Sequence, residues 1–498
     1  MKILIAKTTV VLFISFSSLC FGQEIHHMDL GTAIEVAKQQ SPTMLSLMRQ
    51  VDVASYNLKA TNSRFKTRVS MNVTLPQYNE TINKYEDSLG ITFYPIRQSY
   101  MSTSLSISQP LPTDGSLSIT SGIVNYTDYY ADNRNAQVST SIGLSQPIEA
   151  LFGVNNMKLS MKQAKLSYDM TMKRLKRQKL DLVYIVSQSF YNLLSSREAM
   201  KIADMNMARQ LEAYETAKNK YEAGLLREVE ALQMEVDLTS ATNQYENTKT
   251  SYKSQTRQFK ETIGIEPTDS IVLLNQMEYI VIKVNPEDAV ARAMKHRNEL
   301  RESKIQIEIK EMNLKRQKAA GRISGNVNLN YNFIGVDKSS RSIPIGTTFE
   351  NTWHNLTDRP GSFGVGLTAR IPLIDWGENK ARVKSAESSL EQDKIDLGNT
   401  KRSIEREIRS LVDQLHNSLR GLEIMEKSVV IAEKSFDISR QRYANDEIDS
   451  QAMALERERL NKAYTAHLSS YITYKLSLSD LMRKTFFDYE RNEEVIDL

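Results

Sequence analysis

The sequence has little cysteine, proline and glycine: one, 11 and 19 residues out of 498. The single cysteine, Cys20, falls inside an N-terminal apolar run, so disulfides within the chain are excluded. The scarcity of proline and glycine at this length favours long helices over a loop-rich fold. The chain also lacks a strong excess of positive or negative residues, since its net charge is only +4. This near balance gives no electrostatic reason to expect nucleic-acid binding.

Long hydrophobic runs are absent beyond the N-terminus. Residues 1–22 have the features of a secretory signal peptide, with Lys2 and Lys7 ahead of an apolar run, and we expect Gln23 to begin the mature chain. An uncleaved anchor helix is the first alternative, although the run is shorter than the ~20 residues that a membrane span needs. No other run reaches ~18 apolar residues, so a membrane crossing would have to use strands in a closed barrel.

A lipoprotein is the second alternative for this N-terminus, because Cys20 lies close to the expected cleavage site. Acylation signals place a small residue directly before the cysteine, whereas this chain has Leu19 there. The residue types therefore favour ordinary cleavage over lipid attachment.

Two stretches, 151–221 and 376–443, each predict one unbroken helix. Such helices would be roughly 100 Å long, whereas helices in globular proteins average about 11–12 residues. Both stretches repeat apolar residues every seven positions, which is typical of packed, supercoiled helices. The repeats are Val186, Leu193, Met200, Met207, Tyr214 and Tyr221, and then Ile408, Leu415, Leu422, Val429, Phe436 and Tyr443.

The chain divides into two halves, residues 23–285 and residues 286–498, with a C-terminal tail on the second. Each half is expected to contain a helix of moderate length, a strand-rich segment, the long helix, a tight turn and a second moderate helix. A period above 200 residues is too long for a solenoid repeat and indicates duplication of a whole domain. The moderate helices are expected at 29–66, 228–263, 286–319 and 449–484, with a small strand patch in the linker 264–285.

The strand-rich segments, 68–148 and 324–373, alternate apolar residues with Ser, Thr, Asn and Gly. A transmembrane barrel with an apolar outside and a polar lumen predicts this alternation, although a soluble sandwich could show it too. Two to four strands per half cannot close a barrel alone, so we expect the chain to oligomerise. We expect 77–99 and 335–360 to be outer loops, and an aromatic belt of Tyr94, Tyr100, Tyr126, Tyr129 and Tyr130.

Three motifs carry a resemblance to a known family. They are Leu30-x-x-Ala33-x-x-x-Ala37-x-x-x-Ser41-Pro42 at the start, Ser145-Gln146-Pro147 before the first long helix, and Lys220-Tyr221-Glu222-Ala223-Gly224-Leu225 at the tip turn. In this order, within a duplicated chain, they resemble the TolC-type outer membrane efflux protein family. The resemblance implies a mainly α fold with a β-barrel portion. The helices would form a coiled-coil tunnel through the periplasm, and trimerisation would complete the barrel in the outer membrane.

The resemblance also implies a function and partners. The chain would be the passive exit duct of a tripartite efflux or type I secretion system. Its partners would be two other copies, a periplasmic adaptor, an inner-membrane pump and outer membrane lipid. The candidate docking residues at the tips are Tyr221, Ala223, Gly224, Leu225, Tyr443, Asn445 and Asp446.

The sequence departs from the family in two places. Asp446 stands where the tip motif has glycine, and paired gate aspartates of some members align with Ala452 and Leu455. The first strand segment is also longer by about one hairpin, 102–124 around Thr113-Asp114-Gly115. A trimer would have twelve strands without this hairpin in its wall and eighteen with it.

Acidic residues gather at both tip turns, and a trimer would bring three copies of each to one opening. Carboxylate rings favour cations, so these residues are candidates for a pore gate, with a solvated turn as the alternative. The candidates are Glu228, Glu230, Asp446, Glu447 and Asp449, together with the neighbouring cations Arg227 and Arg442.

Residues typical of catalysis or cofactor binding do not form a recognisable set, so we expect no enzyme activity, cofactor or metal centre. The pair His26-His27 is interpreted as a solvated terminus, and the 20 methionines as packing residues. Two other classes were weighed: a non-conducting trimeric coiled-coil surface scaffold, and an enzyme on a helical stalk. The exported substrate cannot be read from the sequence.

Overall fold

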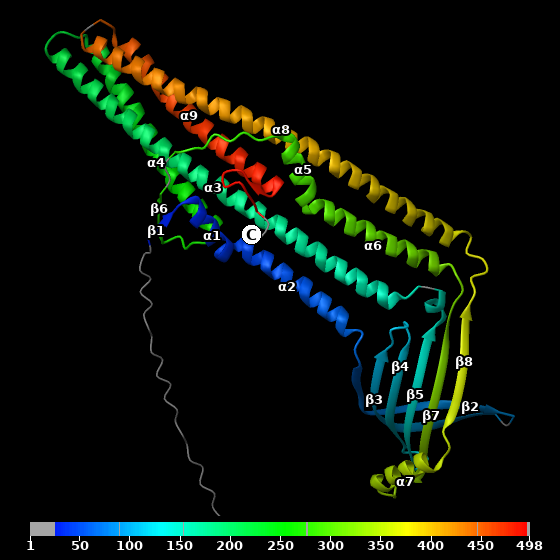
Figure 1. The fold of residues 1–498 in the computed structure, drawn as a ribbon. Helices are drawn as coiled ribbons and strands as arrows, with labels where there is room; N and C mark the ends of the chain where they lie inside the picture. The colour runs from blue at the N-terminus through cyan, green and yellow to red at the C-terminus, as the bar shows by residue number, and fades with distance from the viewer. Residues whose placement is uncertain (1–24, 89, 153, 275–276, 446, 496–498) are drawn as a thin grey trace, which may run out of the picture. The chain divides into compact units, whose positions relative to one another are not determined.

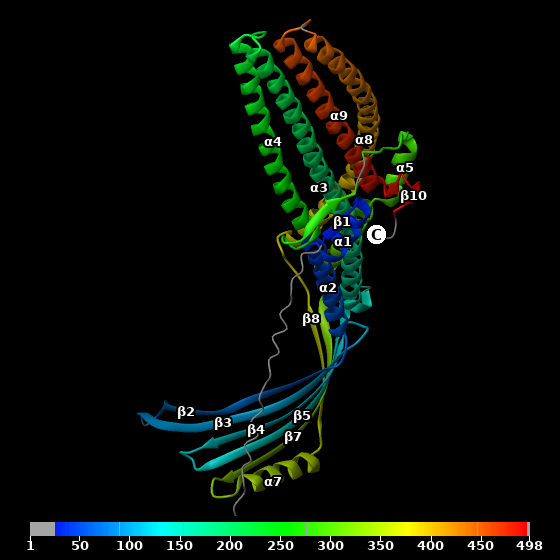
Figure 2. The same cartoon turned by 90° about the vertical axis from the view of Figure 1, so that its left-hand side faces the viewer.

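The structure is a computed structural model that describes residues 25–88, 90–152, 154–274, 277–445 and 447–495 (Figures 1 and 2). The expected signal peptide therefore lies outside the described residues. Two compact units emerge, and each gathers segments from both sequence halves. Among the described residues, the first comprises those within 25–46, 179–289 and 408–495, and the second those within 47–178 and 290–407. The chain thus crosses between the units within its long helices.

Both long helices are present. Helix α3 spans Asn156–Glu222 and helix α8 spans Glu378–Ala444, each with 67 residues. They begin a few residues later than expected. Before α3 a 3-10 turn, η1 (Ile148–Phe152), intervenes. Before α8, Trp376 and Gly377 have φ angles of 52° and 86°, which a helix cannot continue. The carboxylate of Asp375 then accepts hydrogen bonds from the backbone N–H groups of Gly377 and Asn379.

Two of the four moderate helices are single helices as expected: α4 (Glu228–Ile263) and α9 (Ser450–Thr485). The other two are each broken once. The first separates into α1 (Leu30–Gln40) and α2 (Pro42–Ser63). Proline disfavours helical geometry in the residue before it, and Ser41 is extended, with φ −60° and ψ 140°.

The second break separates α5 (Pro286–His296) from α6 (Asn298–Ala320). No proline causes it. Arg297 is extended instead, and its buried guanidinium bonds Glu299 at 2.7 Å and also bonds Glu407. The prediction of one continuous helix was therefore wrong in both halves, for different physical reasons.

In the first unit, a parallel pair of short strands forms from distant segments. Strand β1 (Ile25–Met28) pairs with β6 (Ser270–Leu273). The linker thus supplies one strand, and its partner comes from the N-terminal segment rather than from the linker itself. His26 Nε2 lies 3.2 Å from Asp269 Oδ2, so His26 belongs to a strand and not to a solvated terminus.

A dense apolar core fills the first unit beside this strand pair. We call it the basal core and define it by Phe190 and Leu193 of α3, Phe259 of α4, and Tyr471 and Tyr474 of α9, all at most 1% exposed. The Phe190 and Phe259 rings meet edge to face with centroids 6.1 Å apart. The Tyr474 hydroxyl donates to the carbonyl of Ile280 at 2.6 Å, which fixes the linker against α9.

The second unit contains one antiparallel sheet of six described strands in the order β2-β3-β4-β5-β7-β8. The strands are β2 (Arg68–Asp87), β3 (Gly90–Pro110), β4 (Ser116–Asp128), β5 (Asn133–Pro147), β7 (Ser324–Ser340) and β8 (Ser362–Arg370). The turn at 111–115 joins β3 to β4, and both strands pair with their neighbours on either side. The additional hairpin is thus an integral part of the sheet.

The two expected outer loops are regular structure instead. Residues 77–99 mostly extend β2 and β3, which pair up to Asp87 and Gly90. Residues 335–360 contain the end of β7 and helix α7 (Ile345–Asp358). Both loop predictions were wrong, because local polar composition concealed strand pairing in one case and an amphipathic helix in the other.

The strand register sorts the side chains onto two faces, since residues paired across antiparallel strands lie on the same face. One face, here called the apolar face, carries Val69, Met71, Leu105, Ile107, Ile119, Ile123, Ile142, Leu144, Val327, Leu329, Tyr331, Phe333, Phe363, Val365 and Leu367. The opposite face carries mainly Ser, Thr, Asn and Gly, including Ser104, Thr120, Ser141, Asn328 and Gly366.

The expected aromatic belt is only partly compatible with this register. Tyr100 of β3 pairs with Tyr126 of β4. The next pair along the two strands, Met101 with Asn125, has its side chains on the apolar face of the sheet. Both tyrosines therefore lie on the polar face, opposite the apolar side chains that a belt would have to adjoin. Separately, none of the described helices is long and apolar enough to cross a membrane.

Candidate functional site: the helical tips and the cavity behind them

The first tip turn, between α3 and α4, is a helix stop of defined geometry. The backbone N–H of Leu225 donates to the carbonyl of Lys220 at 2.8 Å, and that of Gly224 to the carbonyl of Tyr221 at 2.9 Å. This pair of bonds requires a left-handed residue, and Gly224 has φ 74°. The space around the missing Cβ is open. Glycine is thus needed here for backbone conformation and not for lack of room.

The second tip turn, between α8 and α9, closes similarly. The N–H of Glu447 donates to the carbonyl of Arg442 at 2.8 Å, and the N–H of Asn445 to that of Gln441 at 3.1 Å. Asp446, the candidate at the position of glycine, lies outside the described residues. Asp449 is the N-cap of α9, since its Oδ1 accepts from the N–H of Ala452 at 2.8 Å. Its carboxylate therefore has a structural role.

The charged gate candidates form ion pairs within their own turns. Arg227 Nε lies 2.9 Å from Glu230 Oε1, and Arg442 Nε lies 3.2 Å from Glu447 Oε2. Glu228 is exposed in the first turn of α4. In the described part of a single chain these groups do not converge on one opening, so convergence would require other copies.

One contact links the two tips. Lys220 Nζ donates to the carbonyl of Tyr443 at 3.4 Å and lies 5.2 Å from the centroid of the Tyr443 ring. Of the docking candidates, Tyr221, Ala223, Gly224, Leu225 and Asn445 are exposed, whereas Tyr443 is half-buried under this lysine. Tyr443 thus joins the tips instead of presenting a free surface.

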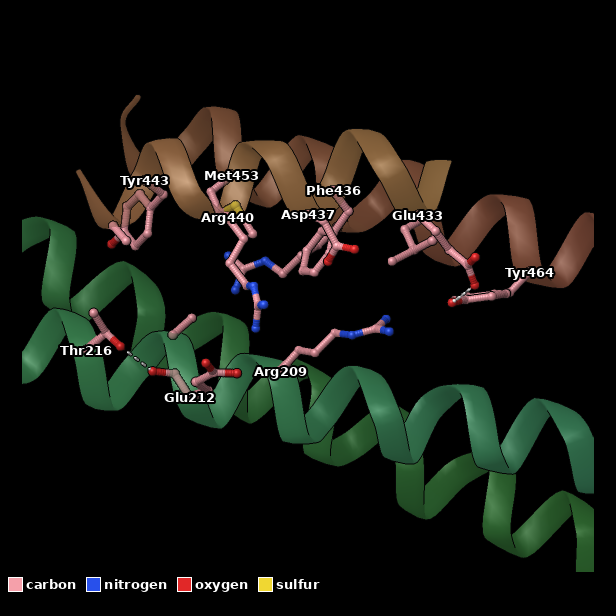
Figure 3. Close-up of a pocket in the computed structure, with 14 residues that line it drawn as sticks. Arg209, Glu212, Thr216, Glu433, Phe436, Asp437, Arg440, Tyr443, Met453 and Tyr464 are labelled. Carbon is pink, nitrogen blue, oxygen red and sulfur yellow. Dashed lines mark hydrogen bonds between the residues drawn. The ribbon is translucent and has the colours of Figure 1, made fainter. Parts of the chain in front are cut away.

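Behind the tips, α3, α8 and α9 enclose a cavity of about 500 Å³ (Figure 3). We call it the tip cavity. Its lining includes three arginines, Arg209, Arg440 and Arg457, and three carboxylates, Glu212, Glu433 and Asp437. Phe436 lies on the wall, with the Arg209 guanidinium 5.2 Å from its ring centroid. A second hollow of about 590 Å³, between α3, α4 and α9, shares Arg457 with the first.

Arg457 is the most unusual group of this region. Only 3% of the residue is exposed, and its Nε and Nη1 are buried without a hydrogen-bond partner among the described residues. Its Nη2 contacts the sulfur of Met234 at 3.8 Å. Burial lowers the pKa of Arg457, and the nearby Asp237 partly offsets this. A buried unpaired cation destabilises its surroundings.

Sequence reasoning did not find the tip cavity, although a signal existed. Met453, Arg457, Leu460 and Tyr464 follow the spacing i, i+4, i+7, i+11, which places them on one face of α9. A cation within such an apolar stripe indicates either a buried polar seam or a partner. No cluster of three or more metal-binding side chains occurs in the portion that the structure describes.

The sequence matches the outer membrane efflux protein family over residues 33–264 and again over 295–445. The two matched segments lie in the two predicted halves. A search of curated protein sequences found no significant match.

Solved structures share the fold at low sequence identity. The CmeC outer membrane channel of Campylobacter jejuni is 13% identical, with a TM-score of 0.66 over 97% of this chain and 94% of that one. The MtrE outer membrane channel of Neisseria gonorrhoeae, solved in its open state, is 14% identical, with a TM-score of 0.65 over 92% and 88%. The outer membrane protein VceC of Vibrio cholerae is 12% identical, with a TM-score of 0.64 over 92% and 95%.

Proposed function

Because this chain belongs to the outer membrane efflux protein family, whose members are outer membrane channels and not enzymes, we propose that it is the passive exit duct of a tripartite export system. The observation that carries the proposal is the two-faced sheet. Its apolar face is largely exposed in the single chain, as at Val365 (64%) and Leu367 (70%). Its other face is lined by hydroxyl and amide side chains. A wall with lipid on one side and water on the other needs this division.

The duct is a homotrimer in the outer membrane that extends into the periplasm. Six strands per copy would give eighteen in three copies, which is enough for a wide, water-filled barrel. In the described part of a single chain the outer edges of β2 and β8 are unpaired, so each could pair with a neighbouring copy.

Exposed apolar stripes on the helices support the same assembly. Along α8, Ile424, Ile431 and Ile438 recur every seven residues and are 59%, 68% and 60% exposed. Val229, Leu232 and Val236 form a similar exposed stripe at the start of α4. Stripes of this length in water usually mark interfaces.

The exposed tip residues, led by Gly224 and Leu225, dock a periplasmic adaptor that connects the duct to an inner-membrane pump. The duct itself has no nucleotide-binding motif, so the energy comes from that pump. The substrate class stays open between small molecules and proteins.

The tips also form the gate. Tip charges from three copies would surround the opening, with Glu228, Glu230 and Glu447 nearest to it and Arg227 and Arg442 as their counter-ions. The tip cavity supports a movable gate, because helices beside a hollow have fewer contacts to lose on separation than helices in a dense core. The contacts that a movement would have to break include the small cluster of Phe436, Met453 and Leu460.

A crosslink across the helices tests gate and duct together. The side-chain amides of Asn206 on α3 and Asn461 on α9 are hydrogen-bonded at 2.6 Å, so these two positions face each other and a cysteine pair is introduced there, with disulfide formation checked by mass before any recording. In planar bilayers we expect the reduced double variant to conduct like the parent, and oxidation to lower the open probability. Single Cys variants are the controls.

The outcomes separate the two proposals. Equal currents before and after oxidation, with the disulfide verified by mass, would exclude the movable gate. Absence of any current from trimers inserted in the bilayer would instead favour a non-conducting scaffold.

A further inference from the structure

Helix α7 packs against the outer end of the sheet (Figure 2). The strand ends define this direction. Helices α2, α3, α6 and α8 all connect to one end of the sheet, whereas the last residues of β2, the turn 129–132 and helix α7 lie at the opposite end. If the helices stand in the periplasm, α7 lies on the outer side of the membrane.

The contacts of α7 identify the face of the sheet that it covers. A Cβ placed on Gly335 of β7 would lie 2.1 Å from the carbonyl oxygen of Thr352 and 2.7 Å from the backbone nitrogen of Leu356. Ser339 Oγ bonds Thr348 Oγ1 at 2.9 Å. Gly335 and Ser339 are separated by even numbers of residues from Phe333 and Tyr331. Since side chains alternate along a strand, α7 lies on the apolar face.

The neighbouring strand gives the same answer. Val138, paired with Gly335, is 4% exposed, and Ala136, two residues before it, is fully buried. The Thr352 hydroxyl approaches the carbonyl of Ala136 at 3.4 Å. The outer ends of β5 and β7 are therefore covered by α7 on the same face that is bare further along the strands.

Buried side chains and hydrogen bonds hold the inner side of α7 against the sheet. Thr348 and Thr352 are both fully buried, and the Thr352 hydroxyl donates to the carbonyl of Thr348 at 2.6 Å. Asn355 Nδ2 donates to the carbonyl of Val336 at 2.9 Å. These bonds satisfy the hydroxyls of Thr348 and Thr352 and one amide hydrogen of Asn355, so most of the polar groups on the inner side of α7 have partners.

The side of α7 that faces away from the sheet exposes apolar side chains among its polar ones. Trp353 is 59% exposed, and Ile345 and the preceding Ile343 are 43% and 36% exposed. Only Glu350 and Asp358 in this helix carry a formal charge. Tryptophan and amphipathic helices are both favoured at the boundary between lipid headgroups and acyl chains.

We propose that α7 is an interfacial helix that lies on the lipid side of the barrel wall, with Trp353 in the outer headgroup boundary, and that it does not plug the pore. The occupant of its exposed side is a lipid surface. Tyr331 and Phe333, whose ring centroids are 4.8 Å apart, lie on the same face one step nearer the helices and form the edge of the apolar band. The inference rests on the proposed insertion of the sheet into the outer membrane.

Tryptophan fluorescence tests the placement, because the chain has only two tryptophans, Trp353 and Trp376. The W376F variant leaves Trp353 as the sole reporter in proteoliposomes. Lipids brominated near the headgroup should quench Trp353 at least twice as strongly as lipids brominated near the chain end, and aqueous iodide should quench it weakly. Strong iodide quenching with no effect of brominated lipid would overturn the inference.

A second reporter distinguishes failure of this inference from failure of the proposed function. V365W in the W353F/W376F background puts a tryptophan on the bare apolar face of β8. Quenching of this reporter by brominated lipid, without quenching of Trp353, overturns the α7 placement alone. If neither reporter responds, the sheet is not in the bilayer and both proposals fail.

Conductance gives an independent reading. Trp353→Ala should leave single-channel conductance within about a tenth of the parent value, because the side chain faces lipid. A clear rise in conductance would put α7 in the pore and overturn the inference.

Discussion

The first unit holds two regions built from the same helices, one packed continuously and one packed around hollows. In the basal core, Phe190, Phe259 and Tyr471 interlock with almost no exposed surface. Toward the tips, the apolar packing shrinks to a small cluster of Phe436, Met453 and Leu460. Two hollows open beside it, and their lining includes Arg457. The heptad pattern runs through both regions. Heptads therefore determine where helices can pack, whereas the size and polarity of the residues determine how firmly they do so.

This difference has a mechanical consequence. A duct of the proposed kind must hold together while its end opens, and a dense core at one end with hollows between the helices at the other suits that requirement. Close packing resists displacement because each lost contact costs dispersion energy, whereas a cavity wall has fewer contacts to lose.

The most severe test of this contrast compares the same substitution in both regions. Phe190→Ala should destabilise the protein by about 3–5 kcal/mol, since it empties a dense core. Phe436→Ala should cost about 1.5–3 kcal/mol, because its side chain already borders the tip cavity. Denaturant titrations followed by circular dichroism would measure both. Equal losses would mean that the two regions are packed alike.

Substitution of Arg457 should raise the stability of the tip region, whereas substitution in the basal core lowers stability. Arg457→Met keeps the bulk and removes a buried charge with unpaired donors, so we expect a gain of about 1–3 kcal/mol in unfolding free energy. Arg457→Lys, which keeps the charge, serves as the control and should bring no gain. A loss of stability in Arg457→Met would instead reveal a partner for this arginine in the assembled protein.

Gly224 tests backbone geometry at the tip. Gly224→Val forces a β-branched residue to φ 74°, at a cost of about 1–3 kcal/mol confined to the turn. We expect export to fail in cells that carry this variant, while trimers still form on native gels. Gly398→Ala is the control, because Gly398 lies inside α8 in open space and should tolerate the methyl group. Normal export by Gly224→Val would remove Gly224 from the docking site.

The exposed ion pairs should have the smallest effect on stability. Arg442→Gln breaks the pair with Glu447 and should change the unfolding free energy by less than about 1 kcal/mol. Its resting conductance should nevertheless rise if the pair holds the gate. Arg459→Gln is matched to it, since it breaks a surface pair with Glu456 within α9. The gate role would be refuted if both variants gave the same current as the parent.

Much of the fold could be predicted because the patterns that carry it are local. The periodicity of α8 and α4 gave their bounds to within a few residues, and the fold class of long helices with a strand portion in two repeats is confirmed. The breaks at Ser41 and Arg297 were missed. The break at Ser41 has a local cause, the following Pro42. The break at Arg297 depends on Glu407, which is 110 residues away in the sequence.

The site was predictable in part. Gly224 has the expected positive φ, because the end of a helix is determined by a few consecutive residues. The docking and gating roles of the tip residues stay predictions. The tip cavity could not be foreseen in extent, since its walls come from three helices and its volume depends on how they cross.

The sequence by itself determined the periodicities: seven-residue repeats that make long helices, two-residue alternation that gives the sheet an apolar and a polar face, and the duplication that joins them. Tertiary structure decided which residues share a face and what lies behind them. Register put Tyr100 and Tyr126 on the polar face, made the additional hairpin part of the sheet and laid α7 on the apolar side. The reason is physical: backbone periodicity is fixed by neighbours in the chain, whereas register, cavities and buried charges depend on segments that meet only after folding.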